Sequence, residues 1–292
     1  MSGFRWRDGE RTVVYGPGAA GRLEEFGWTS FQVVTTARAD PGLGEALHVG
    51  PGQVPELAAG LLERVTGERL VAWGGGRVID VAKALGSARG LQVCAVPTTL
   101  SGAEMNGGHR QIAGYEHQAR VRPALVLADP ALMTSLPEPE LTWSAMNALA
   151  HAMEALVTPD RNPVASLAAL RAGRLLVEGD RALGSLVAGY ALDSTGFAVH
   201  HVLCQSVVRV CGTPHARTNA ALLPRTHRFL AERAGELLAG FPQPPVTAAV
   251  EVTAERAAVA VDAALARPEL ARTPGPPVTR AELAGLLGSD EL

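Results

Sequence analysis

The stretch VAWGGGRVIDVAKALG, residues 71–86, joins a short apolar run to a helical pattern through three consecutive glycines. Gly74, Gly75 and Gly76 carry no Cβ, so the backbone can adopt a positive φ and an anionic group can approach the N–H groups at the start of the helix. We therefore interpret the segment as a strand, a phosphate-binding turn and a helix of an α/β sheet. An ordinary glycine-rich strand-to-helix turn is the alternative.

Two charged residues follow this turn on the predicted helix. Lys83 is the only lysine among 26 lysine and arginine residues, which indicates a position that needs a compact ammonium and not the flat guanidinium fork. Asp80 lies one helical turn earlier, close enough to hold that ammonium or a hydroxyl group of a cofactor. We predict that both residues bind a cofactor. A solvated Asp–Lys pair on the surface is the alternative.

Short β-branched runs alternate with helical patterns up to about residue 130. The runs are residues 12–16, 31–36, 70–73, 92–97 and 124–129, and residues 54–65 have helical spacing. This alternation predicts a parallel sheet covered by helices. Alanine- and leucine-rich helical segments dominate after it, so we predict an α/β domain over residues 1–130 and an all-α domain over residues 131–292. A capping box of Thr279 and Glu282 is expected to open the last helix.

Hydroxyl side chains follow two of the predicted strands. Open α/β sheets bind their ligands beyond the carboxyl ends of the parallel strands. Thr36 ends one run, and Thr98, Thr99 and Ser101 follow another. These hydroxyls suit hydrogen bonds to a ribose or a carboxamide, so we predict four further cofactor-binding residues. A polar turn that caps the sheet is the alternative.

The helical half contains two pairs of polar residues with suggestive spacing. Asn147 and His151 are four residues apart and share one helix face. His201 and His215 lie on either side of a glycine and a proline. Two such pairs can converge on one point, and we expect that point in the cleft between the domains. A lone histidine on a helix is more often a satisfied polar residue.

Taken together, several segments resemble a known family. They resemble motifs of the iron-containing alcohol dehydrogenase superfamily and follow in the same order. This superfamily shares the fold of dehydroquinate synthase. Within the superfamily, the segments are most similar to the maleylacetate reductase branch. The resemblance spans about residues 10–225, and the chain is short for the family in its helical domain. The segments are GGGRVIDVAK (74–83), VPTTLSGAE (96–104), LADPALMTSLP (127–137), MNALAHAMEAL (146–156), HHVLCQSV (200–207) and GTPHARTNAALLP (212–224).

The resemblance implies an oxidoreductase that uses NADH or NADPH to reduce a small keto or enol carboxylic acid. In that reaction the three imidazoles of His151, His201 and His215 are hydrogen-bond donors or acids near the reacting oxygen. Arg38 could meet a 2′-phosphate, and no acidic ribose ligand follows Thr36, so NADPH is favoured over NADH.

The resemblance also places a divalent metal at Asn147, His151, His201 and His215. Metal-dependent members have an aspartate at the first of these positions, whereas maleylacetate reductases have asparagine. Asn147 therefore removes the only negative charge from the ligand set, and ligand charge is a main contributor to divalent-ion affinity. We predict a metal-free site with Asn147 and the three histidines as catalytic residues. Zinc or iron bound by the three histidines is the alternative.

Two residues depart from the pattern of that branch. Gln205 stands where the pattern HHxxCH has a histidine that could relay a proton, and Arg217 stands where an acidic residue is usual. We predict that both contact the substrate, with Arg217 binding a carboxylate. The loss of the histidine keeps two alternatives open: a repurposed homologue that performs non-redox acid–base chemistry, such as a dehydratase, isomerase or cyclase, and a noncatalytic binding subunit.

Composition excludes several classes of partner. The net charge is −3, and basic and aromatic residues do not interleave, so nucleic acid is not an expected partner. The sequence has neither a signal-peptide pattern nor an uninterrupted membrane-spanning stretch. Its three cysteines are an odd number without C-x-x-C spacing and predict reduced thiols. We expect a soluble cytoplasmic protein that acts on a small molecule and forms a homodimer.

Overall fold

The computed structural model describes residues 3–288 and divides into two compact units, residues 1–136 and 137–292. The predicted boundary after residue 130 lies inside the short helix α3 (Pro130–Met133), which belongs to the first unit. The first unit is α/β, and every element described in the second unit is helical. The predicted fold class is therefore confirmed.

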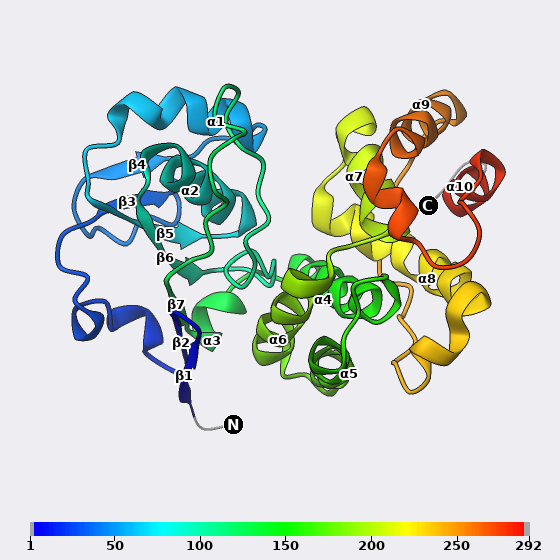
Figure 1. Cartoon of the computed structure of the whole chain (residues 1–292), viewed down its shortest axis with the longest axis horizontal. Coiled ribbons are helices and arrows are strands. Elements are labelled where there is room, and N and C mark those ends of the chain that lie inside the picture. Colours follow the sequence, from blue (N-terminus) through cyan, green and yellow to red (C-terminus); the bar gives the residue numbers. More distant parts are fainter. Residues whose placement is uncertain (1–2, 289–292) are drawn as a thin grey trace. The chain divides into compact units, whose positions relative to one another are not determined.

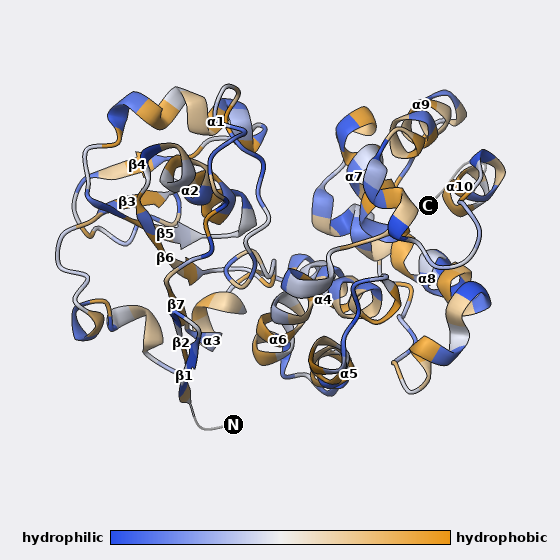
Figure 2. Cartoon of the chain, in the orientation of Figure 1, coloured by the Kyte–Doolittle hydropathy of each residue, from blue (hydrophilic) through white to orange (hydrophobic). Residues whose placement is uncertain are grey.

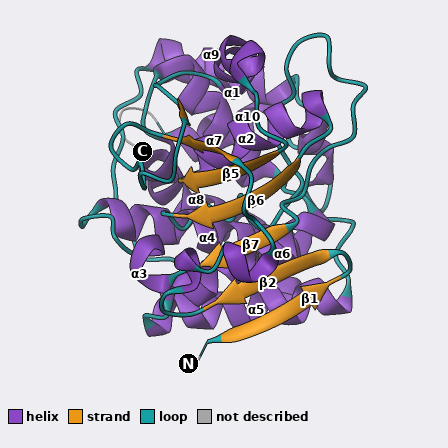
Figure 3. Cartoon of the chain, turned by 90° about the vertical axis from the view of Figure 1, so that its left-hand side faces the viewer, coloured by secondary structure: helices purple, strands orange, loops and turns teal. Residues whose placement is uncertain are grey.

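The first unit contains a seven-stranded sheet with the order β1-β2-β7-β6-β5-β3-β4. Figure 3 shows β1, β2, β7, β6 and β5 of this sheet side by side. Every neighbouring pair is parallel except β1 and β2, which form an antiparallel hairpin at one edge. The strands are β1 (Phe4–Asp8), β2 (Arg11–Tyr15), β3 (Gln32–Thr35), β4 (Ala46–His48), β5 (Arg69–Gly74), β6 (Gln92–Pro97) and β7 (Leu125–Ala128).

Apolar side chains cover both faces of this sheet. Along β5, Leu70 and Ala72 belong to a core that includes residues of helices α1 (Val54–Leu61) and α2 (Gly76–Arg89). Val71, between them, belongs to a second core formed with the 3₁₀ turns near residues 19–26. Successive side chains of a strand point to opposite faces, so burial on both faces explains why the central strands are apolar throughout.

The second unit is a set of packed helices in which α4 is central. It packs against α5, α6 and α8, and α7 packs against α8 and α9. In Figure 2 these helices carry both apolar and polar segments, as expected where one face is buried. The helices, labelled in Figure 1, are α4 (Glu140–Val157), α5 (Pro163–Glu178), α6 (Arg181–Thr195), α7 (Val199–Cys211), α8 (His215–Ala234), α9 (Ala254–Leu265) and α10 (Arg280–Leu287).

Three local predictions are corrected and two are confirmed. The sheet has two additional strands, β1 and β4, and its β1–β2 pair is antiparallel. The predicted helix over residues 54–65 ends as an α-helix at Leu61 and continues as one 3₁₀ turn. The capping box of Thr279 and Glu282 opens α10 as predicted. All three cysteines are free.

No helix within residues 3–288 combines the length and the apolar character needed to cross a membrane.

Candidate active site

The glycine turn lies at the carboxyl end of β5, where the strand passes into α2. Gly75 is the N-cap of α2 with φ −80°, and none of the three glycines has a positive φ. The prediction that these glycines allow a left-handed backbone is therefore wrong. They are required because other atoms lie close: a Cβ on Gly75 would be 2.8 Å from Cγ2 of Thr99, and one on Gly76 would be 2.9 Å from Cβ of Ser101.

The structure brings the predicted hydroxyl residues to this turn. The N–H of Thr98 donates a hydrogen bond of 3.1 Å to the carbonyl of Gly74, which joins the ends of β6 and β5. Thr36 directly follows β3 (Gln32–Thr35), the other neighbour of β5. No side chain caps the N-terminus of α2, so its first N–H groups are free to bind an anion. This edge of the sheet is called the glycine–threonine edge below.

Lys83 lies at the centre of a buried polar network on α2. Its side chain is fully buried, and its ammonium forms an ion pair of 2.8 Å with Asp80. It also donates to the carbonyls of Ala103, Asn106 and Gly108, at 3.0, 3.2 and 2.7 Å. The ammonium therefore fixes the loop after β6, and the alternative of a solvated surface pair is wrong because Lys83 is buried. Contact of Lys83 and Asp80 with a cofactor stays a prediction. The compact ammonium suits this enclosed set of acceptors.

In the second unit, α4, α7 and α8 bring the predicted polar residues together. Asn147 and His151 are buried on one face of α4, and His201 is buried near the start of α7. The rings of His151 and His201 stack at a centroid distance of 4.5 Å. Oε2 of Glu154, one turn after His151, lies 2.6 Å from Nδ1 of His201. These residues form the histidine cluster.

Burial keeps the members of this cluster close to neutral. It lowers the pKa of His201 to about 3 and the pKa of His151 well below its usual value, because a buried imidazolium loses its hydration. Burial also raises the pKa of the Glu154 carboxyl to about 7. The two imidazoles are therefore neutral near pH 7, and they act in the free protein as N–H donors or nitrogen acceptors and not as imidazolium acids.

Three buried polar atoms of the cluster have no partner within the described chain. They are Oδ1 of Asn147, Nδ1 of His151 and Nε2 of His201. A buried polar atom without a hydrogen bond costs about 1–3 kcal/mol, and such atoms commonly mark places where a ligand binds.

His215 enters the cluster through a second polar network. It is the first residue of α8, and its Nε2 lies 3.1 Å from Nδ2 of Asn219. Oδ1 of Asn219 lies 2.6 Å from Nε2 of His200, whose Nδ1 contacts the hydroxyl of Thr226 at 2.7 Å. Asn219 and His200 are completely buried. The network links His215, which is exposed, to the buried interior of the unit.

Gln205 and Arg217, the two predicted substrate-binding residues, differ in the hydrogen bonds that they already form within the protein. Oε1 of Gln205 accepts a hydrogen bond of 2.6 Å from Arg267, so its acceptor is engaged. Arg217 is exposed on the first turn of α8, where its Nε donates to the carbonyl of Ala249. Its guanidinium lies 5.5 Å from the centre of the Trp143 ring. Direct binding of a carboxylate by Arg217 remains a prediction.

Asn147, His151, His201 and His215 are the predicted metal ligands. Within residues 3–288 no group of three or more His, Cys, Asp or Glu side chains is arranged to hold a metal ion. Asn147 supplies only an amide oxygen, and the nearby carboxylate of Glu154 is bound to His201. A divalent ion at this place would therefore lack a carboxylate ligand.

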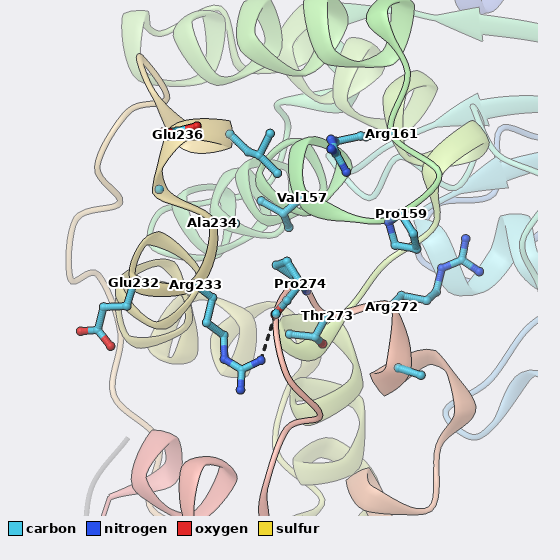
Figure 4. A pocket seen from close by; sticks show the side chains of 14 residues that line it. Val157, Pro159, Arg161, Glu232, Arg233, Ala234, Glu236, Arg272, Thr273 and Pro274 are labelled. Carbon is cyan, nitrogen blue, oxygen red and sulfur yellow. Dashed lines mark hydrogen bonds between the residues drawn. The ribbon is translucent and has the colours of Figure 1, made fainter.

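A separate cavity of about 600 Å³ lies in the second unit. Figure 4 shows Val157, Arg161, Arg233, Arg272 and Pro274 among its lining residues. None of the residues predicted from sequence to form the active site lines it. Two of its arginines are already paired, Arg233 with Glu282 and Arg272 with Asp160.

Comparison with known proteins places the chain in a family. Residues 142–243 match the model described as the Fe-containing alcohol dehydrogenase family, C-terminal. The maleylacetate reductase of Pseudomonas knackmussii is 30% identical over 254 residues, which cover 73% of this chain and 71% of that protein. The chain belongs to the iron-containing alcohol dehydrogenase family. This confirms the resemblance to the superfamily and to its maleylacetate reductase branch.

Other members of the family agree with this assignment. Maleylacetate reductase 1 of Rhodococcus opacus is 35% identical over 67% of this chain, and the match covers 60% of that protein. The chain thus spans about 60% of the length of that curated relative. The crystal structure of a maleylacetate reductase from Agrobacterium tumefaciens has the same fold, with a TM-score of 0.81 at 24% identity over 98% of this chain and 97% of that one.

The family description names iron, so the comparison does not support the prediction of a metal-free site, which stays a prediction.

Sequence reasoning missed Glu154 and Asn219. A signal for Glu154 was present, because it is a lone carboxylate on the apolar segment ALAHAMEAL and follows His151 by three residues. A fully buried carboxylate in such a segment needs a partner. Asn219 offers no comparable signal, since its contacts come from helices that are distant in sequence.

Proposed function

We propose that this chain is an NAD(P)H-dependent reductase of a small keto or enol carboxylic acid, similar to maleylacetate reductase. The relatives named as maleylacetate reductases support the activity and do not favour the non-redox alternatives. The observation that carries the proposal is the presence of two separate polar sites of the required kinds: an uncapped helix N-terminus at the glycine–threonine edge and a cluster of buried neutral imidazoles.

The first site would hold the cofactor. The N–H groups at the start of α2 would bind the diphosphate, and the hydroxyls of Thr98, Thr99 and Ser101 would bind the ribose or the carboxamide. Arg38 is exposed beyond β3, where it would pair with a 2′-phosphate, so we propose NADPH as the preferred cofactor. NAD(P)H supplies a hydride when bound.

The histidine cluster would handle the proton and the oxyanion. Hydride addition to a carbonyl or an enone leaves negative charge on oxygen, which N–H donors in a site with little water stabilise strongly. Neutral His151 can donate a ring N–H there, and Arg217 would hold the carboxylate of the substrate. The homodimer and the cytoplasmic location expected from the sequence remain part of this proposal.

Fluorescence titration with NADH and NADPH tests the cofactor assignment. We expect saturable binding of both, with the lower Kd for NADPH. Absence of binding by either cofactor would favour a noncatalytic subunit.

Replacing Gly75 with valine is expected to abolish binding of both cofactors in this titration. The new side chain would occupy the path of the diphosphate and would press against Thr99, which lies 2.8 Å from the position of the added Cβ. Gly60→Val is the matched control, because a Cβ on Gly60 meets no atom within 4 Å. An unchanged Kd in the Gly75 variant would exclude the glycine turn as the cofactor site.

Purified protein is expected to contain well under one equivalent of zinc or iron, and its activity should survive EDTA. The reason is the amide at Asn147, which supplies a dipole where a carboxylate would supply a full charge. Asn147→Asp should raise the affinity for zinc, measured by calorimetry on chelator-treated protein. Stoichiometric metal that EDTA removes together with activity would show that the histidines are metal ligands.

A further inference from the structure

Glu154 is fully buried and divides its two carboxyl oxygens between two different partners. Oε1 accepts a hydrogen bond of 2.8 Å from the backbone N–H of His200, and Oε2 lies 2.6 Å from Nδ1 of His201. Both partners belong to the first turn of α7, whose N-cap, Ala198, has no side chain that could cap the helix. The carboxylate of Glu154, which belongs to α4, therefore caps the N-terminus of α7.

This arrangement determines which group donates a hydrogen bond to each carboxyl oxygen of Glu154. The first N–H groups of a helix are donors only, and they favour a negative charge at the helix N-terminus. Hydrogen bonds from the backbone N–H groups of Ala198 and His201 also favour the charged form of this carboxyl and lower its pKa. Facing these donors, the ionised carboxylate of Glu154 is an acceptor at both oxygens, so in that form the hydrogen in its contact with His201 belongs to Nδ1 of the imidazole.

A neutral imidazole carries one ring hydrogen, so a hydrogen on Nδ1 leaves a lone pair on Nε2. Nε2 of His201 is also the ring atom that is buried without a partner in the described structure. The ring itself is held from both sides, by stacking on His151 at 4.5 Å and by an edge contact with His200 at 5.0 Å. Its orientation and its tautomer are therefore both determined before a ligand binds.

We propose that Glu154 is a positioning residue that holds His201 in the Nδ1–H tautomer, with Nε2 presented as an acceptor in the site. The consequence for catalysis rests on the proposed function: Nε2 accepts a hydrogen bond from a hydroxyl or enol group of the substrate and orients it. The N–H donation to the oxyanion then falls to His151. Glu154 itself does not contact the substrate.

The substitution Glu154→Gln tests this assignment because it forces the opposite tautomer. The amide has one acceptor, and the backbone N–H of His200 requires it, since an NH₂ group there would face another donor. The NH₂ group must then point at Nδ1 of His201 and donate to it. The remaining hydrogen of the ring moves to Nε2, which loses its lone pair.

The experiment is a ¹H–¹⁵N long-range correlation spectrum of ¹⁵N-histidine-labelled full-length protein at mildly alkaline pH. The His201 signals are assigned by their loss in His201→Gln. We expect a protonated Nδ1 and an unprotonated Nε2 in the wild type, and the reverse in Glu154→Gln. With substrate, Glu154→Gln should lower kcat by about 100-fold or more while the Kd for NADPH stays within about 2-fold.

Ser206→Ala is the matched control, because it also removes a buried hydrogen bond of α7, from the hydroxyl to the carbonyl of Val202. It should leave both the tautomer of His201 and kcat unchanged. A wild-type spectrum with the hydrogen on Nε2 would overturn the proposal, even if Glu154→Gln failed to fold. The spectrum requires no turnover, so the expected tautomer in a protein without reductase activity would refute the proposed function alone.

Discussion

Replacing Lys83 with methionine is expected to destabilise the first unit by about 3–5 kcal/mol, the usual cost of removing one partner from a buried charged network. The loss would leave Asp80 and the carbonyls of Ala103 and Gly108 without their cation. Methionine has nearly the same length and apolar stem, so the change isolates the ammonium. Urea unfolding followed by tryptophan fluorescence measures the effect.

Arg77→Met is the control for this prediction, because it removes a cation from an exposed position of the same helix. Its unfolding free energy should stay within about 0.5 kcal/mol of the wild type. Lys83→Arg should also destabilise the protein, since a guanidinium does not fit the enclosed set of carbonyls. A Lys83→Met variant as stable as the Arg77 control would show that the buried network contributes nothing.

Replacing His201 with glutamine is expected to lower kcat by about 100- to 10,000-fold, the range found when a positioned acid–base group is removed. The glutamine amide can still donate to Glu154, so the contact that supports α7 is retained. Binding of NADPH should be unaffected, because the residues proposed to bind the cofactor lie in the first unit. Steady-state kinetics and the cofactor titration together measure this separation.

His227→Gln is the control for the loss of kcat predicted for His201→Gln. His227 is buried on α8 and stacks on Phe241, outside the histidine cluster. Its replacement should cost stability but should leave kcat within about 2-fold of the wild type. Equal losses in the two variants would mean that a general disturbance of the helical unit, and not the chemistry of His201, lowers the rate.

Most of the fold could be predicted from the hydrophobic pattern. Five of the seven strands and the change to an all-helical unit follow from it, because central strands that are buried on both faces have continuous apolar runs. The two missed strands carry no such signal. β1 is FRWRD and largely exposed at the sheet edge, and β4 has three residues. Both are held in place by their neighbours, which a local pattern does not describe.

The glycine turn and Lys83 show what local sequence leaves undetermined. Three adjacent glycines and a single lysine are unusual in this sequence, but the sequence does not show why these residue types are needed. The loop after β6 places Thr99 and Ser101 against the glycines and three carbonyls against the ammonium of Lys83. Contacts between segments about 20 residues apart depend on the path of that loop. A glycine needed for close approach and one needed for a positive φ look identical in a sequence.

The candidate active site was predicted in its parts but not in its connections. Helical spacing placed Asn147 and His151 on one face of α4, and the structure adds His201 through ring stacking. The hydrogen bonds that orient these rings come from Glu154 and Asn219, and both join different helices. Such contacts depend on how α4, α7 and α8 pack, which periodicity does not determine.

We propose that the chain transfers a hydride from NAD(P)H to a small keto or enol carboxylic acid. The most direct measurement incubates the protein with NADPH or NADH deuterated at C4 of the dihydronicotinamide, on either face, together with maleylacetate, and examines the product by mass spectrometry. The proposed function predicts one deuterium in the reduced product from one face of the cofactor, and none with His201→Gln on the same time scale. Cofactor binding without deuterium transfer from either face, under conditions in which a known maleylacetate reductase reacts, would contradict it.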